Sequence, residues 1–373
     1  FLSFIAQACG ANKPEDAKHA SSQAVLATLV MGSILTVIVL SLSGMIPTWM
    51  QVDVNIRQTA SMYFFILYLP MLPRTASIIF GTILRAAGDT KTPMKVGIGV
   101  NVINVILNYL LIYPAHTISL GFISFNMPGA GLGVIGAALA SAIAFAFGGI
   151  YMTYVFWHHP VISPKGHTIK PDMEILKPCL KVAFPNMMQR FGTSLGYVAF
   201  ASMINSVGEI ATAAHTIANT VESAFYIPGY GMQTAAATLA GNSLGANDKQ
   251  KIKDFTKVII KLEVAMMLVS GGLLFAFAPT MMGLFTKDPQ VIQLGATVLR
   301  MVAVSEPFYG VSIIIEGIMQ GVGQTVTPFK FNILGMWGVR IVGTFICINL
   351  FDMGLISAWA CMISHNLLLF TMF

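Results

Sequence analysis

Residues 88–95 read GDTKTPMK and residues 323–330 read GQTVTPFK, so that five of the eight positions are identical. The two copies lie 235 residues apart, and the tripeptide Gly-Ala-Asn at residues 10–12 returns at residues 245–247 with the same offset. Two separate matches at one offset are typical of an internal duplication. The sequence therefore predicts two related halves.

The sequence around these copies is strongly apolar. Hydrophobic residues make up 55% of the chain and charged residues 10%, whereas an average soluble domain has about 25% charged residues. Segments such as residues 25–46 and 258–277 are long enough to cross a hydrocarbon core, which takes ~20 apolar residues. Composition and length together predict an integral membrane protein.

Apolar length and bounding charges predict ten complete transmembrane spans, and residues 1–9 resemble the end of an eleventh. The predicted spans are residues 24–46, 58–81, 94–113, 131–157, 178–206, 210–241, 255–281, 291–319, 328–350 and 354–373. Six spans, an even number, separate each repeated residue from its partner, so the two halves should be parallel repeats. Residues 175–235 have no counterpart in the first half. We therefore expect two six-helix bundles, twelve helices when intact, with the first helix and most of the second missing here.

The predicted fold class is an all-α membrane protein in three parts. Residues 1–157 form an N-terminal lobe, residues 158–177 a cytoplasmic linker and residues 178–373 a C-terminal lobe. Loops on one predicted side of the membrane contain fourteen Lys and Arg residues, against two on the other side. Because basic residues concentrate in cytoplasmic loops, we expect a multi-pass protein of the plasma (inner) membrane with a cytoplasmic C-terminus.

Other classes of function lack their usual signs in the sequence. The net charge of +6 is spread over short loops, without the basic and aromatic pattern of a nucleic-acid-binding protein. The four cysteines are isolated from one another, which argues against a disulfide framework or a zinc motif. Walker A, HExxH and GxSxG motifs are missing. We therefore expect no enzyme activity and no bound cofactor, and we expect transport to be driven by an ion gradient.

Polar residues inside an apolar span are costly and therefore informative. Asn101, Asn104 and Asn108 lie on one face of the predicted span 94–113. Their carboxamides are satisfied either by hydrogen bonds to neighbouring helices or by a hydrated ion site. Small residues in the predicted span 131–157 would let that helix approach this face closely.

The second half has ionisable groups inside its predicted spans. They are Arg190, His215, Glu222, Glu306, Glu316 and Arg340, accompanied by the polar residues Gln189, Tyr197 and Asn219. A carboxylate at this depth must be paired, protonated or bound to a cation. Two interpretations remain open: a Glu–Arg pair that joins helices, and a cation or proton site whose affinity changes with conformation.

Prolines are expected to interrupt several predicted helices near the middle of the membrane. They are Pro70, Pro73, Pro185, Pro228 and Pro307. Transporters tolerate such breaks where the backbone lines a cavity, although kinks also occur in other membrane helices.

Ordered motifs extend over essentially the whole chain. They are residues 7–11 (QACGA), 84–93 (LRAAGDTKTP), 104–108 (NVILN), 184–189 (FPNMMQ), 208–215 (GEIATAAH) and 228–233 (PGYGMQ), followed by Gly245-Ala246. As a set they resemble the multidrug and toxic compound extrusion (MATE) family, in its bacterial drug/sodium antiporter branch. The resemblance implies two six-helix lobes, alternating access, and cation-driven antiport of amphipathic, often cationic, compounds.

The resemblance also implies where ions bind. In the N-terminal lobe of the family, a helix-five Asn-x-x-x-Asp and a helix-six Thr or Ser surround a cation. Asn104 and Asn108 match the first motif, with Asn in place of Asp, and Ser141 matches the second, so these three are a candidate Na⁺ site. Some members use a helix-seven Glu in the other lobe. This chain has no acid at that point, and Glu306 and Glu222 are the candidates instead.

Our leading hypothesis is a monomeric secondary antiporter that exports small organic cations across the lipid bilayer in exchange for Na⁺ or H⁺. The candidate substrate- and cation-binding residues are Glu306, Glu222, Gln189, Arg190, Asn186, Tyr226, Tyr309, Arg340, Asn104, Asn108 and Ser141. The alternative on the same fold is a flippase for a lipid or lipid-linked glycan, which Arg190 and Arg340 favour. A membrane sensor or scaffold is a third class, but no appended soluble domain is visible to transmit a signal.

Overall fold

The structure, a computed structural model, describes residues 1–49, 52–167 and 169–373. The chain divides into a first unit, residues 1–9 and 13–176, and a second unit, residues 10–12 and 177–373. The break near residue 176 falls within the predicted linker, and helix α8 already begins at Met173. The lobe and linker boundaries stay a prediction.

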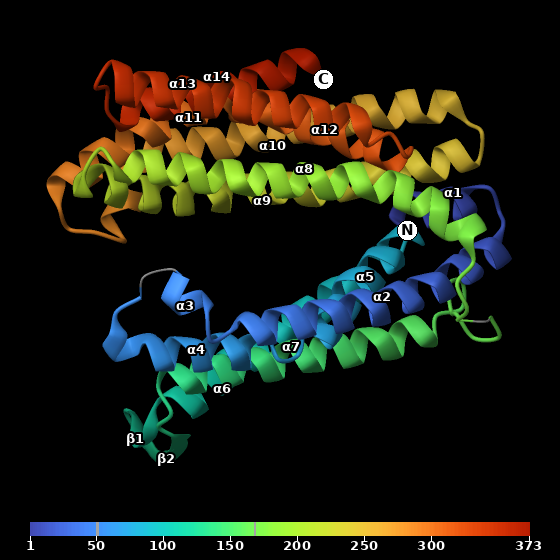
Figure 1. Cartoon of the computed structure of the whole chain (residues 1–373), viewed down its shortest axis with the longest axis horizontal. Coiled ribbons are helices and arrows are strands. Elements are labelled where there is room, and N and C mark those ends of the chain that lie inside the picture. The colour runs from blue at the N-terminus through green and yellow to red at the C-terminus, as the bar shows by residue number, and fades with distance from the viewer. Residues whose placement is uncertain (50–51, 168) are drawn as a thin grey trace. The chain divides into compact units, whose positions relative to one another are not determined.

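The first unit consists of helices and one β-hairpin (Figure 1). Its elements are α1 (Leu2–Gly10), α2 (Pro14–Leu42), α3 (Ile46–Trp49), α4 (Val54–Tyr68), α5 (Met71–Ala86), α6 (Lys91–Ile112), β1 (Pro114–Leu120), β2 (Ile123–Ala130) and α7 (Val134–Trp157). Helices α4 and α5 meet at a bend of 44°. Strands β1 and β2 pair antiparallel between two predicted spans, and apolar periodicity gave no sign of this hairpin.

The second unit is a bundle of long helices that run alongside one another in Figure 1. Its elements are α8 (Met173–Asn205), α9 (Glu209–Gly245), α10 (Lys249–Gly283), α11 (Pro289–Gly321), α12 (Val326–Ile333), η1 (Leu334–Ile341), α13 (Val342–Phe345), η2 (Ile346–Leu350) and α14 (Leu355–Met372). The segments η1 and η2 are π-helical, and α12 through η2 form one continuous span of 25 residues.

The described helices agree with the predicted spans. Seven helical segments are long and apolar enough to cross a membrane, and the bent α4–α5 pair makes an eighth. Helices α8 and α9, of 33 and 37 residues, occupy the two remaining predicted spans. They are long enough to cross, but they do not contain a comparably apolar stretch. The predicted all-α membrane fold is confirmed.

The duplicated motifs adopt similar backbone conformations in their two copies. Gly88 and Gly323, the first residues of the matched octapeptides, have φ values of 93° and 90°. Such left-handed values at a helix end favour glycine, which has no Cβ. Asn12 and Asn247 of the matched tripeptides have φ values of 61° and 56°. Similar φ values at equivalent positions support the internal duplication.

Close helix packing in the first unit depends on glycine. A Cβ on Gly149 of α7 would lie 2.2 Å from the carbonyl oxygen of Pro73 in α5. A Cβ on Gly136 of α7 would lie 2.4 Å from the carbonyl oxygen of Leu111 in α6. Small residues therefore let α7 approach both neighbours at backbone distance, as membrane helices often do.

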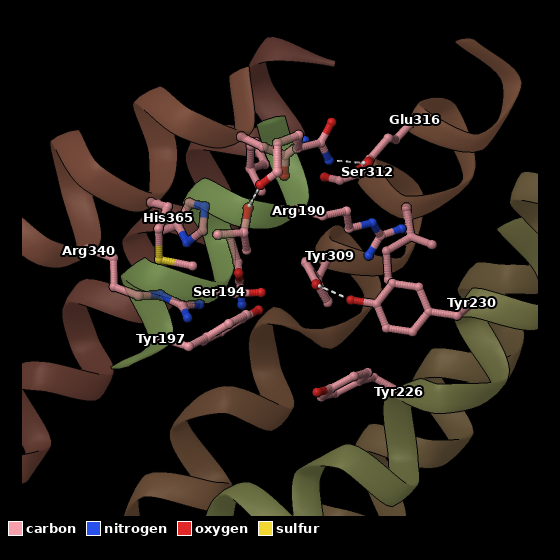
Figure 2. Close-up of a pocket in the computed structure, with 17 residues that line it drawn as sticks. Arg190, Ser194, Tyr197, Tyr226, Tyr230, Tyr309, Ser312, Glu316, Arg340 and His365 are labelled. Atoms are coloured by element: carbon pink, nitrogen blue, oxygen red, sulfur yellow. Dashed lines mark hydrogen bonds between the residues drawn. The ribbon is translucent and has the colours of Figure 1, made fainter. Parts of the chain in front are cut away.

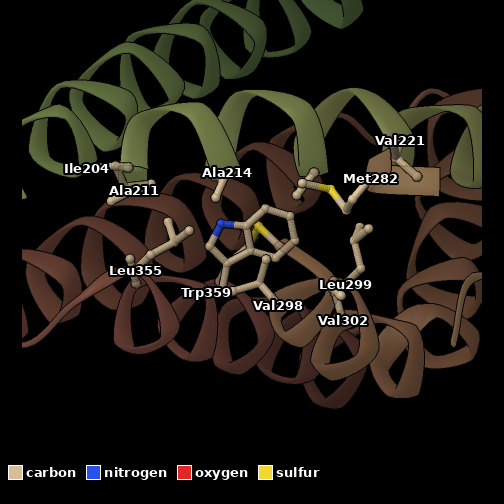
Figure 3. Close-up of a cluster of buried hydrophobic side chains, with 14 of the residues drawn as sticks. Ile204, Ala211, Ala214, Val221, Met282, Val298, Leu299, Val302, Leu355 and Trp359 are labelled. Atoms are coloured by element: carbon tan, nitrogen blue, oxygen red, sulfur yellow. The ribbon is translucent and has the colours of Figure 1, made fainter. Parts of the chain in front are cut away.

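The hydrophobic core of the second unit surrounds Trp359 of α14 (Figure 3). This indole is fully buried among side chains of α9, α11 and α14, including Ala214, Val298 and Leu355. Its Nε1 donates a hydrogen bond of 3.1 Å to Nδ1 of His215 on α9. The contact fixes α14 against α9, the helix that also contributes polar residues to the interior.

Candidate functional site

A cavity of about 300 Å³ lies inside the second unit, among α8, α9, α11, α12, η1 and α14 (Figure 2). Five residues of the predicted site line it: Gln189, Arg190, Tyr226, Tyr309 and Arg340. Tyr230, which the sequence also suggested as a wall residue, lines it too, and so do Tyr197, Glu316 and His365. Its wall therefore combines phenol hydroxyls, guanidinium groups and a carboxyl group.

A second cavity of about 310 Å³ adjoins the first. The two share Tyr197, Tyr226, Tyr309, Arg340 and Asn366, so they are neighbouring parts of one polar interior. Glu222 and His215 line the second cavity. Glu306 lines neither cavity and is 1% exposed, so it lies behind the cavity wall.

Three tyrosines of α9 and α11 form an aromatic wall. The hydroxyl groups of Tyr230 and Tyr309 are 2.9 Å apart. The ring of Tyr226 stands edge-on to both, at centroid distances of 5.7 Å and 6.2 Å. Aromatic faces attract cations through the ring quadrupole, so this wall can hold an organic cation as well as an apolar body.

Glu316 belongs to a network of amide groups at the first cavity. Its Oε1 accepts hydrogen bonds from Gln189 Nε2 at 2.7 Å and from Gln320 Nε2 at 3.2 Å. The same Gln320 nitrogen approaches Oδ1 of Asn186 at 3.3 Å. Asn186 therefore contacts this network, although it lines neither cavity. The Glu316 carboxyl group is well supplied with donors.

Three other glutamates come from three helices: Glu222 lines the second cavity, whereas Glu263 and Glu306 line neither cavity. Glu222 of α9, Glu263 of α10 and Glu306 of α11 are all buried. Glu306 interacts electrostatically with both of the others. In the described chain, neither oxygen of Glu263 has a hydrogen-bond partner, and Glu306 has none apart from the carboxyl group of Glu222. A carboxyl group in this setting is either protonated or neutralised by a bound cation.

Glu263 is a residue that the sequence interpretation missed. A Cβ on Gly229 of α9 or on Gly310 of α11 would lie 2.8 Å or 2.9 Å from its Oε1. The side chain thus reaches between these two helices at positions where only glycine leaves room. The signal was present in the sequence, because an acid inside the predicted span 255–281 is as informative as Glu222 or Glu306.

Arg340 is buried between two aromatic rings. Its guanidinium carbon lies 5.3 Å from the ring centroids of both Tyr197 and Phe200. Glu222 interacts with it electrostatically. However, the ion pairs found among the described residues all lie in the first unit, so the Glu–Arg pair, one of the two interpretations of the sequence, is not formed here.

Three of the mid-span prolines do not interrupt their helices. Pro185, Pro228 and Pro307 lie inside α8, α9 and α11, which continue on both sides of them. That expectation was wrong, because the neighbouring turns keep their hydrogen bonds while each proline removes one N–H donor. Pro70 and Pro73 do coincide with the α4–α5 bend.

The candidate Na⁺ residues of the first unit lie on facing helices. The Ser141 hydroxyl of α7 donates to Oδ1 of Asn104 on α6 at 3.4 Å. Oδ1 of Asn108 is buried and has no hydrogen-bond partner in the described part of the chain. Asn101 is exposed. The described residues include no group of three His, Cys, Asp or Glu side chains arranged to hold a metal ion, so any Na⁺ site here would depend on neutral oxygens.

Asp89 and His159 face each other outside the membrane-spanning segments. His159 Nε2 lies 3.8 Å from Asp89 Oδ2. Burial raises the pKa of Asp89, but hydrogen bonds from Thr92 and the backbone of Lys91, together with the nearby His159, lower the pKa overall. Burial also lowers the pKa of His159, and the neighbouring Asp89 only partly opposes this. The attraction between the two side chains therefore depends on pH, because it requires a protonated His159.

The second unit is thus a bundle of membrane helices with a polar interior, and it is related to the first unit by duplication. The MatE family model matches residues 1–110 and 185–346. The chain belongs to the MATE family. As a MATE protein it is a multi-pass transporter of the plasma membrane, with the lipid bilayer and small-molecule substrates as its partners.

Curated MATE relatives align with nearly the whole chain. A "probable multidrug resistance protein NorM" of Thermotoga maritima is 26% identical over 360 residues, 96% of this chain and 75% of the relative. A "probable multidrug resistance protein YoeA" of Bacillus subtilis is 27% identical over 359 residues, 95% of this chain and 75% of the relative.

Solved structures of MATE proteins have the same fold. The crystal structure of a MATE protein in complex with MaD3S has a TM-score of 0.87 at 21% identity, covering 99% of this chain and 80% of that one. A MOP superfamily transporter from Pyrococcus furiosus, described as having a binding pocket of reverse polarity, has a TM-score of 0.88 with the same identity and coverage. At this identity the likeness establishes the fold alone.

Proposed function

We propose that this MATE protein exports organic, cationic, amphipathic compounds in exchange for Na⁺ or H⁺ by alternating access. The observation that supports this most directly is the carboxyl group of Glu222 on a cavity with tyrosine walls, with Glu306 buried behind it. The names of the relatives, which describe probable multidrug resistance proteins, point the same way.

Recognition of an amphipathic cation requires an apolar surface and a negative charge. Tyr226 and Tyr309 offer ring faces to a flat or bulky body, and Glu222 offers the charge. A phenol ring can meet substrates of different shapes without losing much conformational entropy. The arrangement therefore suits a transporter that accepts several related compounds.

Antiport results if the carboxyl groups of Glu222 and Glu306 bind the coupling ion and the substrate alternately. Glu306 lies close enough to Glu222 for the two carboxyl groups to interact, and two neighbouring carboxylates cannot both remain charged without compensation. A proton or Na⁺ that neutralises the pair would leave when the substrate cation arrives, and return when the substrate departs. The two cations then move in opposite directions.

The proposal also covers topology and assembly. The C-terminus lies in the cytoplasm, as the distribution of basic residues between loops favours. The protein works as a monomer, without an organic cofactor. In the first unit, Asn104, Asn108 and Ser141 bind Na⁺ through neutral oxygens.

The test uses the protein in liposomes loaded with a fluorescent organic cation. Na⁺ and pH gradients are imposed separately while dye movement is followed. We expect efflux under one of the gradients and its loss when the matching ionophore collapses that gradient. Dye that moves equally with and without a gradient would contradict antiport.

Glu306→Gln tests the assigned ion-binding group in the same assay. The amide cannot release a proton or bind a cation by charge, so gradient-driven efflux should fall about tenfold or more. Glu209→Gln, at an exposed position in the first turn of α9, should leave efflux within about twofold of the unaltered protein. Equal efflux from both variants would remove Glu306 from this role.

A flippase for lipids or lipid-linked glycans is the second candidate. Arg190 and Arg340 on the first cavity favour it, because a headgroup phosphate needs cationic partners. If dye stays in place under both gradients while labelled lipid crosses between leaflets, this alternative replaces the antiporter.

A further inference from the structure

Export of a simple cation leaves Arg340 unexplained. The side chain is 4% exposed, and its Nε has no hydrogen-bond partner among the residues that the structure describes. Burying a charge without a full set of hydrogen-bond partners is costly, and the cation–π contacts with Tyr197 and Phe200 offset only part of that cost. Packing alone would have favoured an apolar residue at this position.

His365, which lines the same cavity, is also buried without hydrogen-bond partners in the described chain. The side chain is 5% exposed, and neither ring nitrogen has a partner in the described chain. An imidazole always has at least one N–H to donate. A Cβ on Gly335 would lie 2.4 Å from His365 Cδ2 and 2.7 Å from Nε2. The absence of a side chain at Gly335 therefore makes room for this ring.

The backbone that presents Arg340 is itself unusual. Arg340 lies in η1, a π-helical segment of eight residues, in a span that also contains the π-helical segment η2. A π-helical turn is less stable than an α-turn and is found frequently at functional sites, where it changes the direction of a side chain. The same segment contains Gly335, so one distortion provides both the arginine and the space for the histidine.

These donors face a cavity. Arg340 and His365 both line the first cavity, and Figure 2 shows them with Tyr197 on one side and Tyr226 and Tyr230 on the opposite side. Arg340 also lines the second cavity, where Glu222 is a neighbour. The two opposite charges interact without joining in an ion pair within the described chain. Space is thus left between them.

We infer that Arg340 and His365 form a subsite for an anionic group, a carboxylate or a phosphate, of the transported compound. This rests on the proposed export of organic cations and extends it: the substrate is dipolar, with its cationic group toward Glu222 and its anionic group toward Arg340. A guanidinium group suits both anions, because its donors match their paired oxygens. The tyrosine rings hold the body between the two charges.

Two forms of one dye test the inference in proteoliposomes. A rhodamine with a free carboxylate is dipolar, whereas its methyl ester is a plain cation of nearly the same shape. We expect Arg340→Gln to reduce transport of the free acid about tenfold or more, with the ester within about twofold. His365→Asn, which keeps one donor, should reduce transport of the free acid by a smaller factor.

Arg300→Gln is the matched control. Arg300 also stacks on an aromatic ring, that of Phe275, and donates to the Phe275 carbonyl oxygen, but it is exposed and lines neither cavity. It should change transport of neither dye. Equal losses of the acid and the ester in Arg340→Gln would overturn the inference and assign Arg340 a structural role. Because that variant could fold poorly, Arg340→Lys is measured too, and it should keep part of the preference for the acid.

A labelled phospholipid tests the second possible source of the anionic group, because its headgroup phosphate would bind the same guanidinium group as a carboxylate does. Lipid movement between leaflets that Arg340→Gln abolishes, without dye transport, supports the anionic subsite and overturns the proposed export. If the unaltered protein transports the ester and Arg340→Gln affects neither dye, the inference fails and the proposed export stands. If the unaltered protein moves neither dye nor lipid, both fail.

Discussion

The interiors of the two units differ in charge although their helices arise from one duplicated plan. In the second unit Glu222, Glu263, Glu306 and Arg340 are buried. In the first unit the buried polar side chains among the described residues are serine, threonine and glutamine, none of them ionisable. Its apolar cavity, lined by residues such as Phe80, contains no charged group.

This difference separates the requirements of folding from those of transport. Both units pack long helices closely, but only buried charge gives a site whose occupancy depends on protons, cations or an ionic substrate. The following experiments test that separation, from the largest expected effect to the smallest.

Trp359→Ala should have the largest effect, on the stability of the second unit. Removal of a fully buried indole leaves a cavity and costs ~3–5 kcal/mol. Chemical unfolding in detergent should show a lower midpoint, with earlier proteolysis of the second unit. Trp49→Ala, at a residue 63% exposed in the first unit, should change stability by less than ~0.5 kcal/mol. Equal effects would mean that Trp359 is not the centre of that core.

Gly149→Ala tests the packing of the first unit. Its Cβ would approach the Pro73 carbonyl oxygen to 2.2 Å, so α5 and α7 must separate, at a cost of ~1–3 kcal/mol. Gly97→Ala is the control, because a Cβ there meets no atom within 4 Å. Thermal unfolding should distinguish the two. A tolerated Gly149→Ala would show that glycine contacts do not hold this unit together.

Ser141→Ala probes whether neutral oxygens of the first unit bind an ion. Loss of the 3.4 Å bond to Asn104 alone should cost ~0.6 kcal/mol. If the proposed Na⁺ site exists, replacing choline by Na⁺ should raise the unfolding midpoint of the unaltered protein but not that of the variant. Ser364→Ala, which removes an exposed hydroxyl of α14, should keep the Na⁺ effect. A Na⁺ effect that survives in Ser141→Ala contradicts the site.

The smallest effect is expected at His159. Its folded-state pKa is below 6.5, so the unfolded state binds more protons just below that pH, and stability falls as the pH drops through 6.5. Hydrogen exchange at residues 158–163 should speed up relative to the rest between about pH 7.5 and about pH 5.5. His159→Gln should remove this local dependence, and its persistence would assign it to another group.

Apolar length predicted the spans well because the bilayer sets the length of every crossing helix. It could not predict the β1–β2 hairpin, which lies between spans, or the π-helical turns of η1, which depend on neighbouring helices. The predicted span 58–81 proved to be two helices meeting at 44°. Prolines indicated that bend but also suggested breaks in α8, α9 and α11 that do not exist.

The sequence predicted several residues of the candidate site, but not which of their side chains lie next to one another in the folded bundle. Mid-span polarity identified Glu222, Glu306 and Arg340, since ionisable groups in a membrane are rarely incidental. Which of them meet depends on how each helix is rotated against its neighbours, and sequence spacing reports only one helix at a time. Thus Glu306 was placed with Glu222 in one substrate- and cation-binding site although it lies behind the wall, and His365 was overlooked although it lines the cavity.

Gly88 and Gly323, equivalent positions of the repeat, bear on the origin of the two halves by duplication. Their φ values differ by only a few degrees, while the next position has changed from Asp89 to Gln324. Mutation after duplication was free to alter side chains in these turns, but any residue with a Cβ would have strained the helix end. The φ value has therefore been retained while the neighbouring side chains diverged. A protein in which residues 88–95 and 323–330 are exchanged should still fold.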